Sequence, residues 1–171
     1  MKEMAGRVAL VCSMMTLSPA PGRCGDDAPS RVRLRRTREG FAVGQAVRGA
    51  LQHLADQRCQ AVFEDFSAVS GKTLGQVLED QAQTGQTYLG LLFFYDGGDA
   101  AICRMPGVLA FTHPGSRVVQ VCGARFKEGF ETNPARMEAV IIHELLHSLG
   151  LGENPPSPSQ ITARVAERCL E

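Results

Sequence analysis

The chain has 171 residues, of which 44% are hydrophobic, and its 18 lysine and arginine residues balance 18 aspartate and glutamate residues. This length is enough for one domain with a hydrophobic core and too short for two domains of ordinary size, so we expect a single compact unit. The neutral charge balance argues against nucleic acid or an anionic membrane surface as the main partner.

The first twenty residues have the features of an export signal. Lys2 and Arg7 provide positive charge, and residues 8–17 form an apolar run that is too short to span a membrane. Small residues at positions 18–20 offer a cleavage site. We therefore predict a signal peptide over residues 1–20 and a secreted or periplasmic location. The alternative is a buried N-terminal strand or helix.

Residues 21–32 are predicted to form a flexible linker, because this stretch is rich in proline, glycine and aspartate. Five arginines lie between Arg31 and Arg38, and no aromatic residue is interleaved with them. Such a run is more typical of a solvated segment than of a nucleic-acid surface. We therefore expect the fold to begin near Arg33 and place the domain over residues 33–171.

Five cysteines follow the predicted signal peptide, and an oxidising compartment would favour their pairing. Because five is odd, at least one is left unpaired or pairs between chains. No CxxC motif is present, which weighs against a thiolate zinc finger or a thioredoxin-like dithiol. We expect Cys103 to pair with Cys122, because the two flank a predicted pair of strands. We also expect Cys59 to pair with Cys169, at the ends of two predicted helices, which leaves Cys24 over.

The first half of the domain is predicted to be mainly helical. Apolar residues recur at intervals of three and four over residues 41–59, which predicts a helix with one buried face. His53 lies beside that face and is expected to be a surface or hydrogen-bonded core residue rather than a metal ligand. Residues 62–67 are predicted to form a short strand. Residues 72–83 predict a second amphipathic helix, with Gly85 as a stop signal.

Three strands are predicted in the second half. Residues 88–95 form an apolar run that ends in a Gly-rich turn, and we expect this strand to be central in the sheet. Residues 108–112 and 117–122 predict two further strands around a Pro-Gly turn. His113 begins this turn and is expected to be exposed, although it could approach a metal. A final helix is predicted over residues 160–170.

One long helix near the C-terminus carries the strongest functional signal. Asn133 can cap its N-terminus, Pro134 fits the first helical position, and Gly150 is a typical C-terminal stop. Within this helix His143 and His147 lie four residues apart, so their imidazoles lie on one face and can bind the same ion. The order of helices and strands predicts an α+β fold, and no internal repeat suggests a solenoid.

Glu144 is the candidate general base. It is rotated by about a quarter turn from the two histidines, so it need not be a ligand and can hydrogen-bond a metal-bound water. Zinc favours imidazole and carboxylate ligands, and a catalytic zinc site uses three protein ligands and keeps one position for water. Zinc lowers the pKa of that water to about 7, and Glu144 can then take its proton during attack on a carbonyl.

The sequence HELLHSLGLGE, which begins at His143, resembles the zinc-binding signature of the zincin metallopeptidases. The HExxHxxGxx frame of the metzincin branch is matched by His143, Glu144, His147 and Gly150. That branch places its third ligand three residues beyond the glycine, usually a histidine, and this sequence has Glu153 there. The resemblance covers about the last forty residues. It implies a zincin-like α+β fold, with a small mixed twisted sheet packed on helices that include the HExxH helix.

The third metal ligand has two candidates. Glu153 is preferred, because Gly150 and Gly152 provide the sharp turn that its placement needs. The Met-turn of metzincins is missing, since no methionine follows Met137. In the thermolysin-like branch the third ligand is a glutamate on a later helix. Glu167, on the predicted final helix, is therefore the alternative.

The resemblance implies a zinc-dependent metallopeptidase that hydrolyses peptide bonds in a peptide or protein substrate through a metal-activated water. An edge strand of the sheet would pair with an extended substrate. Tyr88, Tyr95 and His113 are the available groups that could help to stabilise an oxyanion. Two alternatives share the site residues: a secreted zincin-fold binding module with a structural or vestigial zinc site, and a zinc amidohydrolase that acts on a non-peptide amide.

Overall fold

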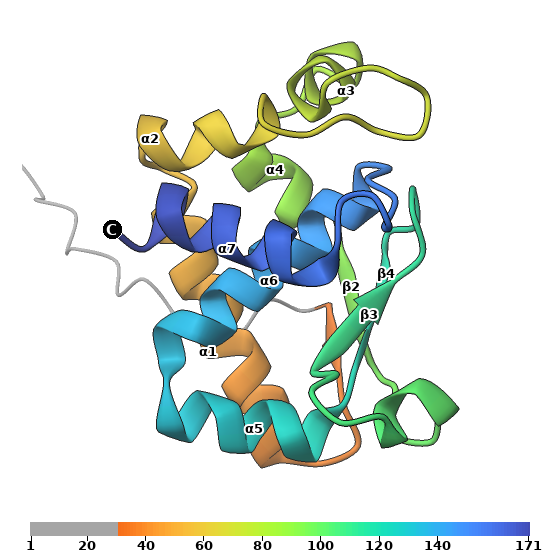
Figure 1. Ribbon diagram of the computed structural model, residues 1–171. Helices are drawn as coiled ribbons and strands as arrows, with labels where there is room; N and C mark the ends of the chain where they lie inside the picture. Colours follow the sequence, from red (N-terminus) through yellow and green to blue (C-terminus); the bar gives the residue numbers. More distant parts are fainter. Residues whose placement is uncertain (1–30) are drawn as a thin grey trace, which may run out of the picture.

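Helices and a small sheet make up residues 31–171, the part of the chain that the computed structural model describes (Figure 1). The helices are α1 (Thr37–His53), α2 (Gln57–Gln60), α3 (Leu74–Asp80), α4 (Gly85–Leu89), α5 (Gly123–Thr132), α6 (Pro134–Ser148) and α7 (Pro158–Cys169), with 3₁₀ helices η1 (Ala61–Phe63) and η2 (Ala101–Arg104). The strands are β1 (Val32–Arg33), β2 (Phe93–Asp96), β3 (Ala110–Thr112) and β4 (Val118–Val121). The predicted α+β class is confirmed.

The predicted signal peptide and most of the predicted linker, including Cys24, lie outside the described residues. Among the helices between residues 31 and 171, none combines the length and the apolar character needed to cross a membrane.

The four strands form one mixed sheet in the order β1-β2-β4-β3. Strands β1 and β4 both run parallel to β2, with Phe94 opposite Val119, whereas β3 is antiparallel to β4. The apolar run that was expected to be central therefore contributes an inner strand. The predicted strand pair around the Pro-Gly turn is a hairpin, and its first strand, β3, lies at an edge of the sheet.

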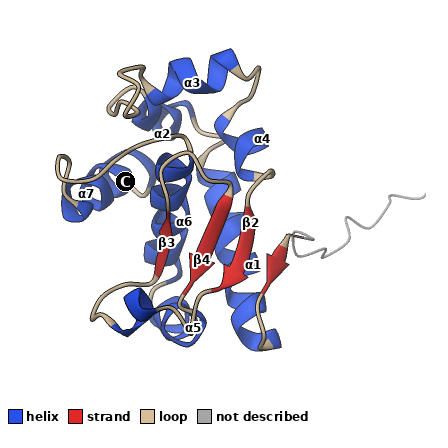
Figure 2. Cartoon of the chain, turned by 90° about the vertical axis from the view of Figure 1, so that its right-hand side faces the viewer, coloured by secondary structure: helices blue, strands red, loops and turns tan. Residues whose placement is uncertain are grey.

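Helices cover one face of the sheet, and the other face is open (Figure 2). Side chains alternate accordingly along β2, where Phe94 is buried beneath the helices, while Phe93 and Tyr95 are exposed on the opposite face. Helix α6 lies on the covered side, in contact with β3 and β4 and with α1, α5 and α7. This central position places α6 between the sheet and the other helices.

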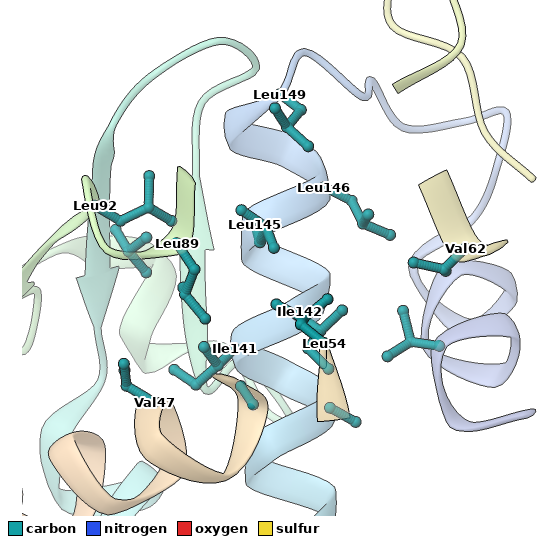
Figure 3. Close-up of a cluster of buried hydrophobic side chains, with 14 of the residues drawn as sticks. Val47, Leu54, Val62, Leu89, Leu92, Ile141, Ile142, Leu145, Leu146 and Leu149 are labelled. Carbon is teal, nitrogen blue, oxygen red and sulfur yellow. The ribbon is translucent and has the colours of Figure 1, made fainter. Parts of the chain in front are cut away.

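The apolar residues of α6 form the middle of the hydrophobic core (Figure 3). They pack against α1 and the residue that follows it, against η1, and against the end of α4 and the segment that leads to β2. The buried residues at this contact are Val47, Leu54, Val62, Leu89, Leu92, Ile141, Ile142, Leu145, Leu146 and Leu149. Burial of each such side chain contributes about 1.5–3 kcal/mol relative to exposure. The position of α6 is therefore strongly determined by packing.

Local interactions fix both ends of α6, as predicted from the sequence. The side chain of Asn133 accepts a hydrogen bond from the backbone N–H of Arg136 at 3.0 Å, and Pro134 begins the helix. At the other end Gly150 adopts the left-handed φ of +106°, and its N–H donates to the carbonyl of His147 at 2.8 Å. The chain therefore leaves the helix and turns back beside its last turn.

Two disulfides join distant segments, and both are the pairings expected from the sequence. Cys59 is bonded to Cys169, which ties α2 to the end of α7 across 110 residues. Cys103 is bonded to Cys122, which ties η2 to the end of β4 across 19 residues. Such bonds are compatible with a secreted or periplasmic protein.

The C-terminal end of α7 is also held by an ion pair. Arg168 donates two hydrogen bonds to the carboxylate of Asp65, at 2.8 and 2.9 Å. These hydrogen bonds, together with the charges of Arg168 and Arg164, hold the pKa of Asp65 below its ordinary value despite partial burial. Helix α7 is thus attached to the segment after η1 as well as to α2.

Two strand predictions differ from the structure. Residues 62–67 were expected to form a strand, but α2 continues directly into η1, and this single turn buries Val62 and Phe63. The first part of the 88–95 run belongs to α4 instead. Thr84 and Thr87 form a reciprocal capping box that starts this short helix, so strand structure begins only at Phe93.

Other boundaries also differ, and several elements were not predicted, among them β1, η2 and α5. The first long helix ends at His53 rather than Cys59, because Asp56 caps a new helix, α2. Strand β1 has only two residues, and no periodic pattern indicates it. Helix α5 was missed as well, although its Phe126 is buried in the core.

We expect the two disulfides to differ in their contribution to stability, because a longer closed loop restricts the unfolded chain more. The chain-entropy estimate is about 5 kcal/mol for the bond between Cys59 and Cys169 and about 3 kcal/mol for the bond between Cys103 and Cys122. Urea unfolding of the two double Cys→Ala variants would measure the losses. A larger loss for the Cys103 and Cys122 variant would contradict this ranking.

Candidate metal centre

Three potential ligand side chains converge at the C-terminal end of α6. The Nε2 atoms of His143 and His147 are 3.0 Å apart, and Glu153 Oε1 lies 3.1 Å from the Nε2 atom of His147 and 3.9 Å from that of His143. One ligand atom from each of the three residues lies within 4.8 Å of the others. Both histidines are buried, while the Glu153 side chain is 39% exposed. This group could hold a metal ion.

The turn after α6 brings Glu153 to the histidines. After the left-handed Gly150, Leu151 forms an antiparallel bridge with Ala68, and Val69 donates its N–H to the carbonyl of Gly150 at 2.9 Å. These bonds hold the chain close to the end of the helix. The sequence-based preference for Glu153 relied on a sharp turn at this glycine, and the structure contains that turn.

Hydrogen bonds with neighbouring segments orient both imidazole rings. His147 Nδ1 lies 2.8 Å from the carbonyl oxygen of Leu151, which can only accept, so Nδ1 carries the proton and the lone pair is on Nε2. His143 Nδ1 lies 3.0 Å from the hydroxyl of Thr162 on α7, which can donate or accept. Partners of this kind fix the ring orientation and tautomer of metal-binding histidines. Both Nε2 atoms therefore face the shared site.

The pKa of His143 is lowered to about 3, mainly by burial and secondly by the nearby His147. The imidazole of His143 is therefore neutral at physiological pH. A metal ligand must be deprotonated at the coordinating nitrogen, so this environment keeps His143 ready to bind an ion.

Glu144 is buried next to this group, with 4% of its surface exposed. Its Oε2 atom and the hydroxyl of Thr112 on β3 have no hydrogen-bond partner among residues 31–171. Burial raises the pKa of Glu144 to about 7; the nearby hydroxyl of Thr112 opposes this rise, and the charge of Glu153 adds to it. A carboxyl group with this pKa can accept and release a proton near neutral pH.

A groove of about 560 Å³ runs alongside the site, between α6, β3 and the N-terminal part of α7. Its lining includes His143, Glu144, His147 and Glu153, together with the whole of β3. Strand β3 lies beside α6 in Figure 1 and Figure 2. The volume is within the range of small-molecule and cofactor sites, roughly 300–1,000 Å³. The candidate metal ligands are thus accessible from an open groove next to a sheet edge.

The alternative third ligand, Glu167, lies elsewhere. Its carboxylate accepts a hydrogen bond from Arg164 at 2.9 Å on the exposed side of α7, and 57% of its side chain is accessible. Its backbone carbonyl accepts a hydrogen bond from Arg58. Glu167 is therefore not part of the group formed by the two histidines and Glu153.

The other histidines and the two tyrosines named in the sequence analysis lie in different surroundings. His53 Nε2 lies 2.8 Å from Oε2 of Glu138 on α6, within hydrogen-bond distance, so His53 is a hydrogen-bonded residue of the fold, as expected. His113 is exposed, as expected, and also lines the groove. Tyr88 is buried and donates its hydroxyl to the carbonyl of Ser148 at 2.9 Å, and Tyr95 lies on the open face of the sheet. Of the three candidate oxyanion groups, only His113 faces the groove.

Two residues of the site, Thr162 and Thr112, were not predicted from the sequence. Thr162 lies 19 residues after His143, and no local pattern links a threonine on one helix to a histidine on another. Thr112 belongs to a predicted strand, but its approach to Glu144 depends on how that strand packs against α6. A polar residue within an apolar strand was the one available signal for Thr112.

We expect Glu144→Gln to stabilise the metal-free protein above neutral pH. The folded-state pKa of about 7 exceeds the ordinary value of 4.5, so the native state binds more protons between these values and loses stability as pH rises through them. The loss is about 3 kcal/mol by pH 8, and the glutamine variant should lack it. Urea unfolding of both proteins from pH 4 to 8, with a chelator present, measures the difference. Parallel stability curves would contradict this expectation.

No protein-family model, curated protein or solved structure matches the chain. A proposal about function therefore rests on the residues and the geometry of the site.

Proposed function

We propose that this protein is a zinc-dependent metallopeptidase, related in its site to the metzincins, that hydrolyses peptide bonds in the groove beside α6. One observation carries the proposal: the carboxyl group of Glu144 is buried next to a convergent group of two histidines and a carboxylate, and its Oε2 atom has no hydrogen-bond partner among residues 31–171. An unpartnered buried carboxyl group is costly for stability. A role of Glu144 in proton transfer would explain why a carboxyl group is kept at this costly position.

The residues present fit zinc. Two neutral imidazole nitrogens and one carboxylate oxygen are a ligand set that zinc prefers, and three protein ligands are typical of catalytic rather than structural sites. Zinc held by His143, His147 and Glu153 would supply a Lewis acid that polarises a peptide carbonyl and lowers the pKa of water. The hydrogen bonds that the two rings make at Nδ1, with the carbonyl of Leu151 and the hydroxyl of Thr162, support this assignment.

The chain's own residues have distinct roles in the proposed reaction. Glu144 takes a proton from the attacking water onto its carboxylate and then passes it to the nitrogen of the leaving amine. Its raised pKa suits both transfers near neutral pH. The free edge of β3 offers backbone N–H and C=O groups that can pair with an extended peptide. His113 is the groove residue available to stabilise the developing negative charge.

Two other functions are less well supported. A structural zinc site in a binding module would have four ligands, whereas three side chains converge within the described residues. Such a module would also give no reason for the buried Glu144. An amidohydrolase acting on a non-peptide amide would use the same residues, but the free strand edge along the groove favours a peptide. The predicted signal peptide and the two disulfides support secretion.

We expect Glu153→Ala to weaken zinc binding and Glu167→Ala to leave it unchanged. Loss of an outer hydrogen bond to a ligand typically costs about 10–100-fold in affinity, and loss of a ligand should cost at least about a hundredfold. Competition with a chromogenic chelator measures the affinity, and Glu167→Ala is the matched control. Weaker binding in Glu167→Ala alone would show that the third ligand is wrongly assigned.

We expect the purified protein to bind one zinc ion per chain and to cleave peptides in a Glu144-dependent manner. Glu144→Gln should keep the zinc but lower the rate of hydrolysis by about 10²–10⁴-fold, which is the usual contribution of a general base. Mass spectrometry of a broad peptide library before and after incubation measures cleavage. One equivalent of zinc without any Glu144-dependent cleavage would refute the peptidase proposal.

A further inference from the structure

Arg136 lies in the groove on the same stripe of α6 as the candidate metal ligands. The stripe consists of Arg136, Val140, His143 and His147, at spacings of four, three and four residues, and all four line the groove. Arg136 is seven residues before His143, which corresponds to about 10 Å along the helix. The arginine therefore lies about two helical turns from the candidate metal site along the groove.

The side chain of Arg136 is exposed and has no partner among the described residues. Its guanidinium group makes no hydrogen bond or ion pair with any residue between 31 and 171, whereas its backbone N–H donates to the side chain of Asn133. The position is also unfavourable for a cation, because the first turn of a helix carries partial positive charge and favours acidic residues. Neither a stabilising ion pair nor helix electrostatics accounts for an arginine here.

Exposed apolar side chains also line the groove. Ile102 and Met105 are 37% and 57% exposed, and both line the groove together with Val140. The loop that carries them is held by the bond between Cys103 and Cys122 and by Arg125, which donates to the carbonyls of Met105 and Val108 at 2.8 and 2.7 Å. This apolar surface is therefore a fixed wall of the groove.

The charges of the groove leave Arg136 uncompensated. Arg136 is the only lysine or arginine in the lining, and Glu144 and Glu153 are the only acidic residues. When a divalent ion is held by the histidines, its two positive charges balance the two carboxylates. The groove then has a net charge of one, carried by the guanidinium group of Arg136, about 10 Å along the helix from His143. This charge attracts a negative group on a bound substrate.

We propose that Arg136 selects peptides that carry a carboxylate about three residues from the hydrolysed bond, with an apolar side chain next to it. This inference rests on the proposed function, since it assumes that a peptide occupies the groove. An extended peptide advances by about 3.3 Å per residue, so three residues span the distance from His143 to Arg136. An arginine binds a carboxylate through two parallel hydrogen bonds. The carboxylate belongs to a glutamate or aspartate side chain or to the C-terminus of the peptide.

The test measures peptide binding without turnover. The zinc-loaded Glu144→Gln protein is titrated with fluorescein-labelled octapeptides of one apolar sequence, in which a single glutamate occupies each position in turn. Because this variant leaves one uncompensated positive charge at the ion, the contribution of Arg136 is the difference from Arg136→Gln in the same background. A peptide with glutamine in its place is the reference, and each peptide is made with a free and an amidated C-terminus. Fluorescence anisotropy gives the dissociation constants. We expect the peptide with glutamate at one particular position, or the peptide with a free C-terminus, to bind at least about fivefold more tightly than the neutral reference peptide.

Variants at Arg136 then identify the residue responsible. Arg136→Gln should abolish this preference and leave the affinity for the neutral reference within about twofold, whereas Arg136→Glu should favour a lysine at the same peptide position. Arg104→Gln, at an exposed arginine of η2 outside the groove lining, is the matched control and should keep the preference. If Arg136→Gln weakens the binding of acidic and neutral peptides equally, or if Arg104→Gln has the same effect as Arg136→Gln, the inference about Arg136 is wrong. The peptidase proposal is not affected by that result. Failure to bind any peptide would overturn the peptidase proposal as well.

Discussion

The burial of α6 is the constraint on which the rest of the structure depends. Its apolar residues fill the core, yet the same helix carries His143, Glu144 and His147, which are buried too. A buried polar group without a partner costs about 1–3 kcal/mol, so the surrounding segments must supply hydrogen bonds. The loop after the helix supplies the carbonyl of Leu151, and α7 supplies the hydroxyl of Thr162. The placement of both segments therefore satisfies a requirement that α6 creates.

Glu144 is the exception to this rule, and the exception is informative. The two imidazole rings have partners at Nδ1, but Glu144 Oε2 has none among the described residues. Its neighbours do not favour the charged form: burial and the charge of Glu153 both raise its pKa, and the hydroxyl of Thr112 offsets this only in part. A carboxyl group that gained full hydrogen bonding would have a lower pKa and would be a weaker base. The lack of a partner thus reduces stability and preserves basicity.

Local patterns predicted the parts of the fold whose cause is local. The caps at Asn133 and Gly150, and the hairpin around the Pro-Gly turn, depend on residues within a few positions of each other. The strand prediction at residues 88–92 failed because an apolar run of that length fits a buried helix as well, and Thr84 decides between them. The support from Thr162 could not be predicted, since it depends on how two helices pack. At the site, the spacing on α6 placed the histidines, while the partners of their rings depend on tertiary structure.

The short C-terminal segment matters more to the site than its length suggests. Helix α7 has 12 residues, and an isolated helix of this length is marginal in water, so its position depends on its attachments. Cys169 and Arg168 fix its end to Cys59 and to Asp65, and two turns earlier Thr162 meets the ring of His143. The disulfide and the ion pair lie at the far end of α7 from the metal centre. They nevertheless limit how far the Thr162 hydroxyl can move, and hence how far the ring of a metal ligand can turn.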